Sequence, residues 1–300
     1  MKRISAVVLA CAAATTAHAE DVDLTGKFPA GSRQVAMLDS LAVERFTGRD
    51  GPQLSLALER ALLAAEDDGR PHFAIRPDRR DAEGAVTGAV STGVREENYR
   101  KKEKRCVERG DRNKCVREEE QDIPCKRRIV ELTASVRVAS REAIAWSGEP
   151  KRRKEISWCG DQKPSETAET SVQRMIGEIA GELRGVFAPT VRGYSVRFRE
   201  NTKGLPKGAA TRFKAVVKQS QRDLPGACAG WEAIDREVAD HVATVFDLGV
   251  CAEARGDLRD ALTRYERASA LLGRGNEAEA DVDRVRQLMA AREDDVARGR

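Results

Sequence analysis

The chain has 300 residues, of which 40% are hydrophobic and 34% are charged, with a formal net charge of +4 at pH 7. This composition supports a buried core in one or two domains. A charge so near to balance gives no support to a polyanion-binding protein, and because the chain is expected to be exported, we expect no nucleic-acid partner.

The first nineteen residues have the pattern of a secretory signal peptide. Lys2 and Arg3 precede an uncharged run, and Ala17-His18-Ala19 supplies a small-x-small cleavage motif. We expect cleavage after Ala19 and a periplasmic or otherwise exported chain with no later segment able to span a bilayer. The alternative is an outer-membrane lipoprotein anchored through Cys11, which the short apolar run before this cysteine disfavours.

The next part of the chain is predicted to combine strands and helices. Residues 20–32 are expected to form an extended leader, and residues 33–201 a domain. In chain order, hydrophobic periodicity predicts a strand over 35–43, a helix over 52–65, strands over 72–75 and 85–94, two β-hairpins, a helix over 165–188 and a strand over 194–199. This order predicts an α+β fold, with a mixed sheet and two helices on one face.

Six cysteines remain after signal cleavage, an even number that is typical of disulfides in an exported chain. The expected pairs are Cys106–Cys115, Cys125–Cys159 and Cys228–Cys251. A two-residue turn at Gly110-Asp111 would place the first pair directly opposite each other, with Cα atoms about 4.5 Å apart. A longer hairpin that turns near residue 140 brings the second pair together. For the third pair, two buried free thiols are the alternative.

The sequence has no recognisable catalytic or metal-binding motif. It lacks the metalloprotease, nucleophile-elbow, Walker-type and C-x-x-C patterns, and only His72 and His241 remain after signal cleavage. We therefore expect no catalytic residue, no metal, no cofactor and no enzyme activity. The alternative is an enzyme that acts on envelope glycan or lipid through carboxylates of residues 33–201.

Two surface motifs each allow two interpretations. The tripeptide Arg109-Gly110-Asp111 at a hairpin tip is either an adhesion motif or a chance triplet, and chance is favoured. The basic run over residues 151–154 would give a peripheral membrane contact if it faced anionic headgroups. The favoured interpretation is a charged strand edge that discourages pairing with another chain.

Residues 202–300 are predicted to be helical, and they contain an internal repeat. Asp223, Leu224, Ala227 and Trp231 recur 34 residues later as Asp257, Leu258, Ala261 and Tyr265. This period resembles that of the tetratricopeptide repeat, a helix–turn–helix solenoid unit. The resemblance implies a partner-binding groove lined by Arg212, Phe213, Val216, Phe246, Asp247, Val250 and Glu253. The alternative is that these residues pack against the closing helix, expected over 278–297.

The domain before it resembles the periplasmic α/β domain of curli secretion channel proteins and the N-terminal domain of the Tol system's TolB protein. The residues that carry this resemblance are the strand Gln34 to Val43, the helix Leu54 to Ala65, the strand start Val86-Thr87-Gly88 and the helix that ends at Ala188-Pro189. Residues 95–128 depart from the channel pattern, because they are crowded with charges that would be costly against lipid. A pore is therefore not expected.

Together these patterns predict a disulfide-stabilised adaptor or scaffold that binds a protein in the cell envelope, with assembly or transport of surface components as a candidate role. The sequence leaves open the partner, the oligomeric state, and whether the groove is open or filled by the last helix.

Overall fold

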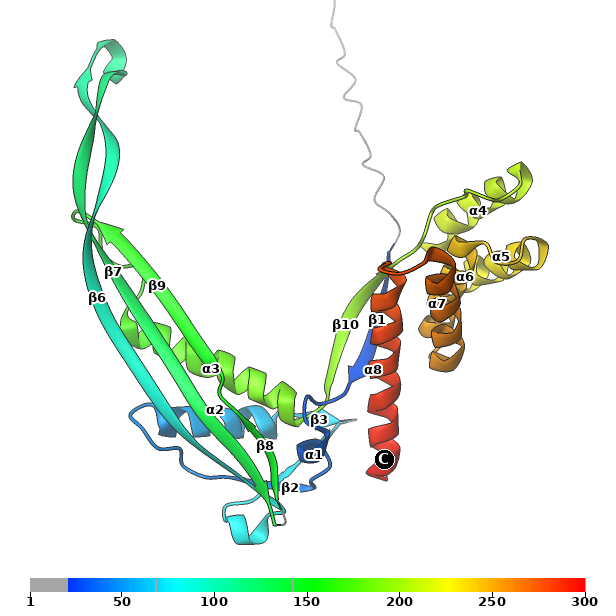
Figure 1. The fold of residues 1–300 in the computed structure, drawn as a ribbon, viewed down its shortest axis with the longest axis horizontal. Coiled ribbons are helices and arrows are strands. Elements are labelled where there is room, and N and C mark those ends of the chain that lie inside the picture. Colours follow the sequence, from blue (N-terminus) through cyan, green and yellow to red (C-terminus); the bar gives the residue numbers. More distant parts are fainter. Residues whose placement is uncertain (1–20, 68, 142, 300) are drawn as a thin grey trace, which may run out of the picture. The chain divides into compact units, whose positions relative to one another are not determined.

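The computed structural model describes residues 21–67, 69–141 and 143–299. The expected signal peptide and Cys11 lie outside the described residues. The described chain forms two compact units, which we name the sheet unit (residues 27–191 and 290–299) and the helical unit (residues 21–26 and 192–289). Their content confirms the predicted α+β class, with a sheet and helices followed by five helices (Figure 1).

The sheet unit is built on one mixed sheet in the order β5-β2-β6-β7-β8, with β9 also paired to β7. Its strands are β2 (Ser40–Val43), β5 (Ala74–Ile75), β6 (Gly84–Arg109), β7 (Cys115–Ser140), β8 (Ile144–Gly148) and β9 (Lys151–Cys159). Its helices are α1 (Arg33–Ala36), α2 (Gly51–Leu63) and α3 (Ala168–Phe187). The short strands β3 (Glu66–Asp67) and β4 (Arg70–Pro71) pair separately, and 3-10 turns lie at Arg79–Asp81 and Asp111–Asn113.

The core of this unit lies between one face of the sheet and the helices α2 and α3. On β7, alternate residues from Val130 to Val138 are buried, as the predicted period of two requires. The facing helices bury apolar residues at helical spacing: Leu54, Leu58 and Leu62 on α2, and Val172, Ile176, Ile179 and Leu183 on α3. Each fully buried aliphatic side chain contributes roughly 1.5–3 kcal/mol, so this one interface is the main source of the unit's stability.

The helical unit consists of five helices and a two-stranded sheet. The strands are β1 (Asp21–Phe28) and β10 (Thr190–Arg197), and the helices are α4 (Lys207–Ser220), α5 (Leu224–Glu237), α6 (Val242–Ala254), α7 (Leu258–Leu272) and α8 (Ala278–Ala297). Residues 20–32 were predicted as an extended leader, and β1 lies within them. In the structure β10 belongs to the helical unit, whereas the sequence predicts a domain boundary at residue 201. Whether the chain folds as two independent domains with that boundary stays a prediction.

The 34-residue period corresponds to two helical hairpins. Asp223 and Asp257 each precede the second helix of a hairpin and accept a hydrogen bond from a first-turn backbone N–H. Trp231 and Tyr265 occupy equivalent positions and are fully buried. At Gly249 a Cβ atom would lie 2.8 Å from the Tyr265 ring, so the small residue permits the close contact of α6 with α7.

The last residues of the chain are anchored in the sheet unit. The Arg298 side chain is 4% exposed and donates hydrogen bonds to the backbone carbonyl groups of Leu38 and His72, at 2.8 and 3.1 Å. It also lies 3.0 Å from an Asp39 carboxylate oxygen. One guanidinium group thus satisfies several carbonyl groups of the loop around β2.

All three predicted disulfides are present, with Cα–Cα distances of 5.7 Å (Cys106–Cys115), 4.0 Å (Cys125–Cys159) and 5.8 Å (Cys228–Cys251). The predicted register at the first pair is wrong. Cys106 lies opposite Glu118, and irregular pairing follows up to Arg109, which lies opposite Cys115. The reason is a longer turn than expected, in which Arg112 and Asn113 adopt positive φ angles.

Two predicted element boundaries also need correction. The expected strand over 35–43 begins with a helical turn, α1, which is capped by the Ser32 side chain, so only its second half is extended. The helix α3 is capped by Thr167 in place of Ser165, because the Thr167 hydroxyl accepts from the Thr170 N–H at 3.2 Å. Among the described residues, no helix is long and apolar enough to cross a membrane.

Replacing Gly177 or Gly181 of α3 by alanine should stabilise the protein. Both glycines lie inside the helix, and a Cβ atom at either would meet nothing within 4 Å. Alanine should therefore raise the free energy of unfolding by roughly 0.5–1 kcal/mol per site, because it restricts the unfolded backbone. Urea unfolding measures this change. The control is Gly249→Ala, which gains the same helix propensity but clashes with Tyr265 and should destabilise; a gain at Gly249 would contradict this account.

The tip disulfide should be the first to be reduced in the native protein. Cys115 is exposed and Cys106 partly so, whereas Cys125, Cys228 and Cys251 are buried. Partial reduction followed by alkylation and mass spectrometry should find Cys106 and Cys115 labelled before any other pair. The double variant Cys106→Ser, Cys115→Ser should melt like the parent protein, because the tip contributes nothing to either core. Earlier labelling of a buried pair would overturn this order.

Candidate functional site

The predicted groove residues of the helical unit are mostly buried. Phe213, Val216, Phe246, Asp247, Val250 and Glu253 are between 0 and 8% exposed. Arg212 is the exception, since its side chain is exposed and forms an ion pair with Glu237. Binding of a partner at these buried positions stays a prediction, and it would require the groove to open.

Segments of the same unit occupy the face on which these residues lie. The Asp247 carboxylate accepts the backbone N–H of Arg199 at 2.8 Å, and the Arg199 guanidinium group lies 4.7 Å from the centre of the Phe246 ring. The Glu253 carboxylate, almost fully buried, accepts hydrogen bonds from the hydroxyl groups of Tyr194 and Tyr265, at 2.9 and 2.8 Å.

The same carboxylate forms a two-pronged ion pair with Arg284 of α8, with N–O distances of 2.9 and 2.8 Å. Burial raises the pKa of the Tyr194 and Tyr265 hydroxyl groups, and the Glu253 charge adds to it. Burial alone would lower the pKa of Arg284, but the hydrogen bond and charge of Glu253 outweigh it and raise this pKa. Glu253 therefore joins β10, α7 and α8 in one satisfied network.

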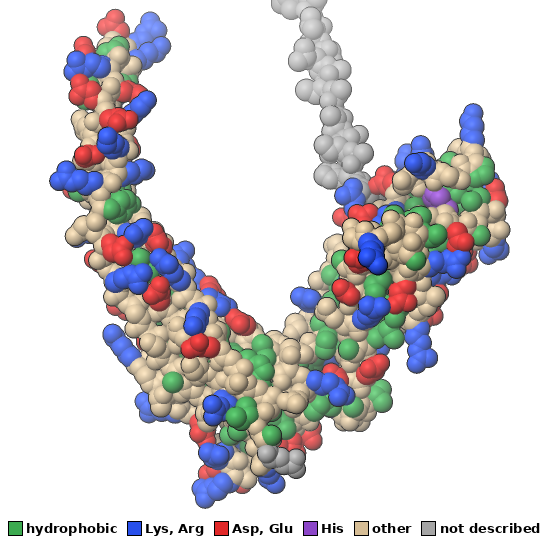
Figure 2. Space-filling model, viewed as in Figure 1, with side chains coloured by type: hydrophobic (Ala, Val, Ile, Leu, Met, Phe, Trp, Pro, Cys, Tyr) green, Lys and Arg blue, Asp and Glu red, His purple; other side chains and the backbone are tan. Residues whose placement is uncertain are grey.

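The most exposed element of the sheet unit is a two-stranded arm, residues 100–124, formed by the far ends of β6 and β7. Beyond Cys125 neither strand has another neighbour in the described chain, because β9 pairs only with Cys125–Thr133. At about 3.3 Å per residue, the ten residues 100–109 reach about 33 Å. Figure 1 shows the arm as a narrow two-stranded ribbon, and Figure 2 shows charged side chains of both signs along it.

The two strands of the arm carry opposite charges. Residues 100–105 of β6 contain five cations and one acid, whereas residues 118–122 of β7 contain four acids. The register places Lys102 opposite Asp122, and Lys104 opposite Glu120. Cross-strand attraction therefore holds the two strands together.

The face of the sheet opposite the helices carries a closed ring of six alternating charges. It runs Arg95, Glu97, Arg127, Glu155, Arg153, Glu131 and back to Arg95, with successive N–O distances between 2.5 and 3.6 Å. The ring surrounds Ile129, which lies opposite Arg95 and Glu155 in the register and is only 2% exposed. Long charged side chains thus cover an apolar residue on a face that no helix covers.

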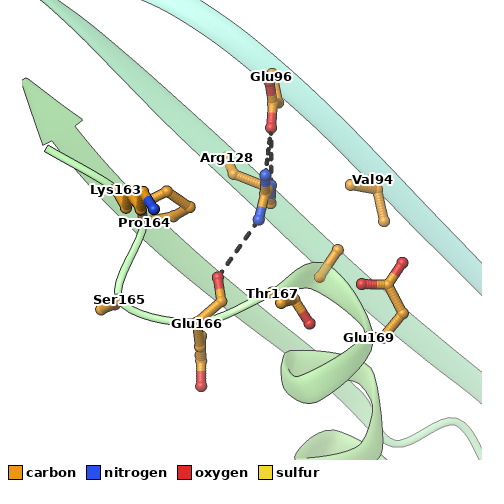
Figure 3. A pocket seen from close by; sticks show the side chains of 10 residues that line it. Val94, Glu96, Arg128, Lys163, Pro164, Ser165, Glu166, Thr167 and Glu169 are labelled. Atoms are coloured by element: carbon orange, nitrogen blue, oxygen red, sulfur yellow. Dashed lines mark hydrogen bonds and ion pairs between the residues drawn. The ribbon is translucent and has the colours of Figure 1, made fainter. Parts of the chain in front are cut away.

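Two cavities lie at the root of the arm. The first, of about 640 Å³, is lined by Val94, Glu96, Arg128 and residues 163–169 at the start of α3 (Figure 3). Arg128 lies at its centre and donates to a Glu96 carboxylate oxygen at 2.8 Å and to the Glu166 carbonyl group at 3.4 Å.

We call the second cavity, of about 540 Å³, the notch. It is lined by Asn98, Tyr99, Arg100, Pro124, Cys125, Lys126, Trp158 and Gly160. Arg128, which lines the first cavity, also contacts a residue of the notch: its guanidinium group stacks over the Trp158 ring at 5.3 Å. Sequence reasoning missed this cavity, since its residues come from three strands that only the fold brings together.

Several carboxylates of the sheet unit have a pKa below the ordinary value. Hydrogen bonds lower the pKa of Glu97 (to Arg127), Glu149 (to Lys151) and Glu166 (to Ser171). A general acid needs the opposite shift. His241 caps α6 by accepting from Thr244, and the described residues contain no group of three or more potential metal ligands.

The basic run of β9 is engaged with acids. Lys151 pairs with Glu149, Arg152 with Glu178 and Glu182 of α3, and Arg153 with Glu131 and Glu155. These contacts fit the prediction of a charged edge strand.

No family model and no curated protein matches this chain. Among solved structures, it is similar to the dodecamer of a PelC variant from Paraburkholderia phytofirmans, with 18% identity and a TM-score of 0.26 over 55% of this chain and 98% of that one. It is also similar to a minor lipoprotein from Acinetobacter baumannii, with 14% identity and a TM-score of 0.23 over 49% of this chain and 89% of that one. Neither similarity assigns a function, and the tetratricopeptide resemblance rests on the period and the helical hairpins alone.

Replacing Asp247 by asparagine should stabilise the protein at neutral pH. Burial raises the pKa of Asp247 well above its usual value. The hydrogen bond from the Arg199 N–H and the Arg199 charge lower this pKa by less than burial raises it, and the Glu200 charge raises it further. The folded state therefore binds the proton more tightly than the unfolded state. The stability that this group contributes is full below the unfolded pKa and is lost as pH rises through the folded one.

Asparagine keeps an oxygen acceptor for Arg199 and removes this loss. The free energy of unfolding of Asp247→Asn should therefore exceed that of the parent at pH 7.5, and the gap should narrow toward pH 4.5. Urea unfolding at both pH values tests this, and a variant that is less stable at pH 7.5 would contradict it.

Proposed function

We propose that this protein is an exported, non-enzymatic adaptor that binds a protein partner in the cell envelope, and that its arm, residues 100–124, makes the main contact. Three disulfides support a location outside the reducing cytoplasm. The observation that carries the proposal is the arm itself.

Packing in the two cores does not account for the regular two-stranded structure of the arm. Almost all its side chains are exposed, yet it is held by a disulfide at each end and by cross-strand charges. An isolated two-stranded hairpin is marginally stable in water, so these constraints make a rigid projection from a segment that would otherwise fluctuate. A rigid projection loses less conformational entropy on binding than a flexible one.

The arm also offers two kinds of contact to a partner. Beyond the ends of β2 and β9, the outer edges of β6 and β7 have no strand beside them in the described chain, so their backbone groups are free to pair with an added strand. The positive β6 and negative β7 would favour a partner whose charges are arranged in the opposite sense. In contrast, most of the predicted groove residues of the helical unit are buried by segments of the same unit.

A photocrosslinking residue placed at Val116, which is 63% exposed near the arm tip, tests this proposal in living cells. We expect one dominant protein adduct, which mass spectrometry would identify. The matched control is Ile144, which is 55% exposed on β8 of the same unit and should give no such adduct. Equal labelling from both positions, or none from Val116, would refute the arm as the contact.

A shortened arm provides a second measurement. Replacing residues 101–123 by an Asn-Gly turn joins Arg100 to Pro124, which lie opposite each other, and retains Cys125–Cys159. This variant should fold and melt like the parent but no longer copurify with the crosslinked partner. Retained copurification would place the contact elsewhere.

A further inference from the structure

The notch at the arm root has a charge pattern that differs from the neighbouring sheet. Around it cations are matched by acids: Arg127 by Glu97 and Glu155, and Arg128 by Glu96. Inside the notch, Arg100 and Lys126 form no ion pair with any described residue, and the lining contains no acid. The notch is therefore a local site of unmatched positive charge in a protein of nearly balanced charge.

The register explains how these groups converge. Asn98 lies opposite Lys126, and Lys126 lies opposite Trp158, so the three share one face of the sheet. Arg100 follows Asn98 by two residues and lies on that face as well. The notch thus combines two cations, an amide and an indole ring around a cavity of about 540 Å³.

The notch is also held in shape before any ligand arrives. The Cys125–Cys159 disulfide joins β7 to β9 between the residues that line it. The Trp158 ring is fixed by the Arg128 guanidinium group, which is itself held by Glu96 and Glu166. A preformed cavity binds with a smaller loss of entropy than a flexible one.

We propose that the notch binds an anionic sugar unit, whose ring packs against Trp158 and whose carboxylate or phosphate is held by Arg100 and Lys126. The indole supplies a flat apolar surface for the C–H face of a sugar ring. The guanidinium group offers two parallel donors to an oxyanion, and the ammonium group adds a third charge-assisted hydrogen bond. The Asn98 amide can donate to or accept from a sugar hydroxyl group.

Titration of the full chain with trigalacturonate, and with its neutral methyl ester, tests the proposal by calorimetry. We expect saturable binding of the acid and binding of the ester that is weaker by about tenfold or more. Vesicles with and without lipopolysaccharide distinguish a lipid-borne anionic sugar from a free polysaccharide. Binding of either source supports the site, and saturable binding of neither overturns it.

Matched variants locate the binding. Arg100→Gln with Lys126→Gln should weaken it by about tenfold or more, whereas Lys101→Gln with Lys104→Gln, an equal charge change on the arm outside the notch, should leave it within about twofold. Equal losses in both pairs would show unspecific attraction and overturn the proposal. Arg100 and Lys126 are exposed, so the fold of their variants should survive. A Trp158→Leu variant that retains the melting temperature of the parent should also bind more weakly. The shortened arm keeps the notch, so this proposal and the adaptor function can fail separately.

Discussion

The antiparallel pairing of β6 with β7 is the interaction on which the rest of the sheet unit depends. It runs from Gly84 opposite Ser140 to Arg109 opposite Cys115. Near its base the pairing supplies one wall of the core, where Val86 lies opposite Val138 beneath the helices. Farther out the same ladder leaves the core and becomes the arm. One continuous pairing therefore determines both the stable part of the unit and the part that projects from it.

Charge has a different use at each level of this ladder. On the face of the sheet opposite the helices, six alternating charges form a ring that covers Ile129. This charged cover disfavours association of the face with other apolar surfaces. In the arm, opposite charges face each other across the ribbon and favour the correct register. At the notch, cations remain unmatched beside an aromatic ring. A net charge near balance gives no support to a polyanion-binding protein, but it does not exclude a local anion site.

In the helical unit, segments of the same chain bury most of the predicted groove residues. Asp247 and Glu253 lie inside α6, and both carboxylates are buried. A buried carboxylate is tolerated only when other groups supply hydrogen bonds or charge. Here the Arg199 N–H serves Asp247, and Tyr194, Tyr265 and Arg284 serve Glu253. The polar residues of α6 thus bind β10 and α8, segments that are distant from it in sequence.

The sequence by itself determined the α+β class, the buried stripes of α2 and α3, the two helical hairpins and the pairs Cys106–Cys115 and Cys125–Cys159, and it favoured Cys228–Cys251 over free thiols. These features follow from local periodicity and from the positions of the cysteines in predicted hairpins and neighbouring helices. The tertiary structure alone decided the length of β6 and β7, the register at the arm tip, the burial of most predicted groove residues and the meeting of Arg100, Lys126 and Trp158. The physical reason is that strand pairing joins residues far apart in the chain, and alternation along one strand does not specify which strand lies beside it.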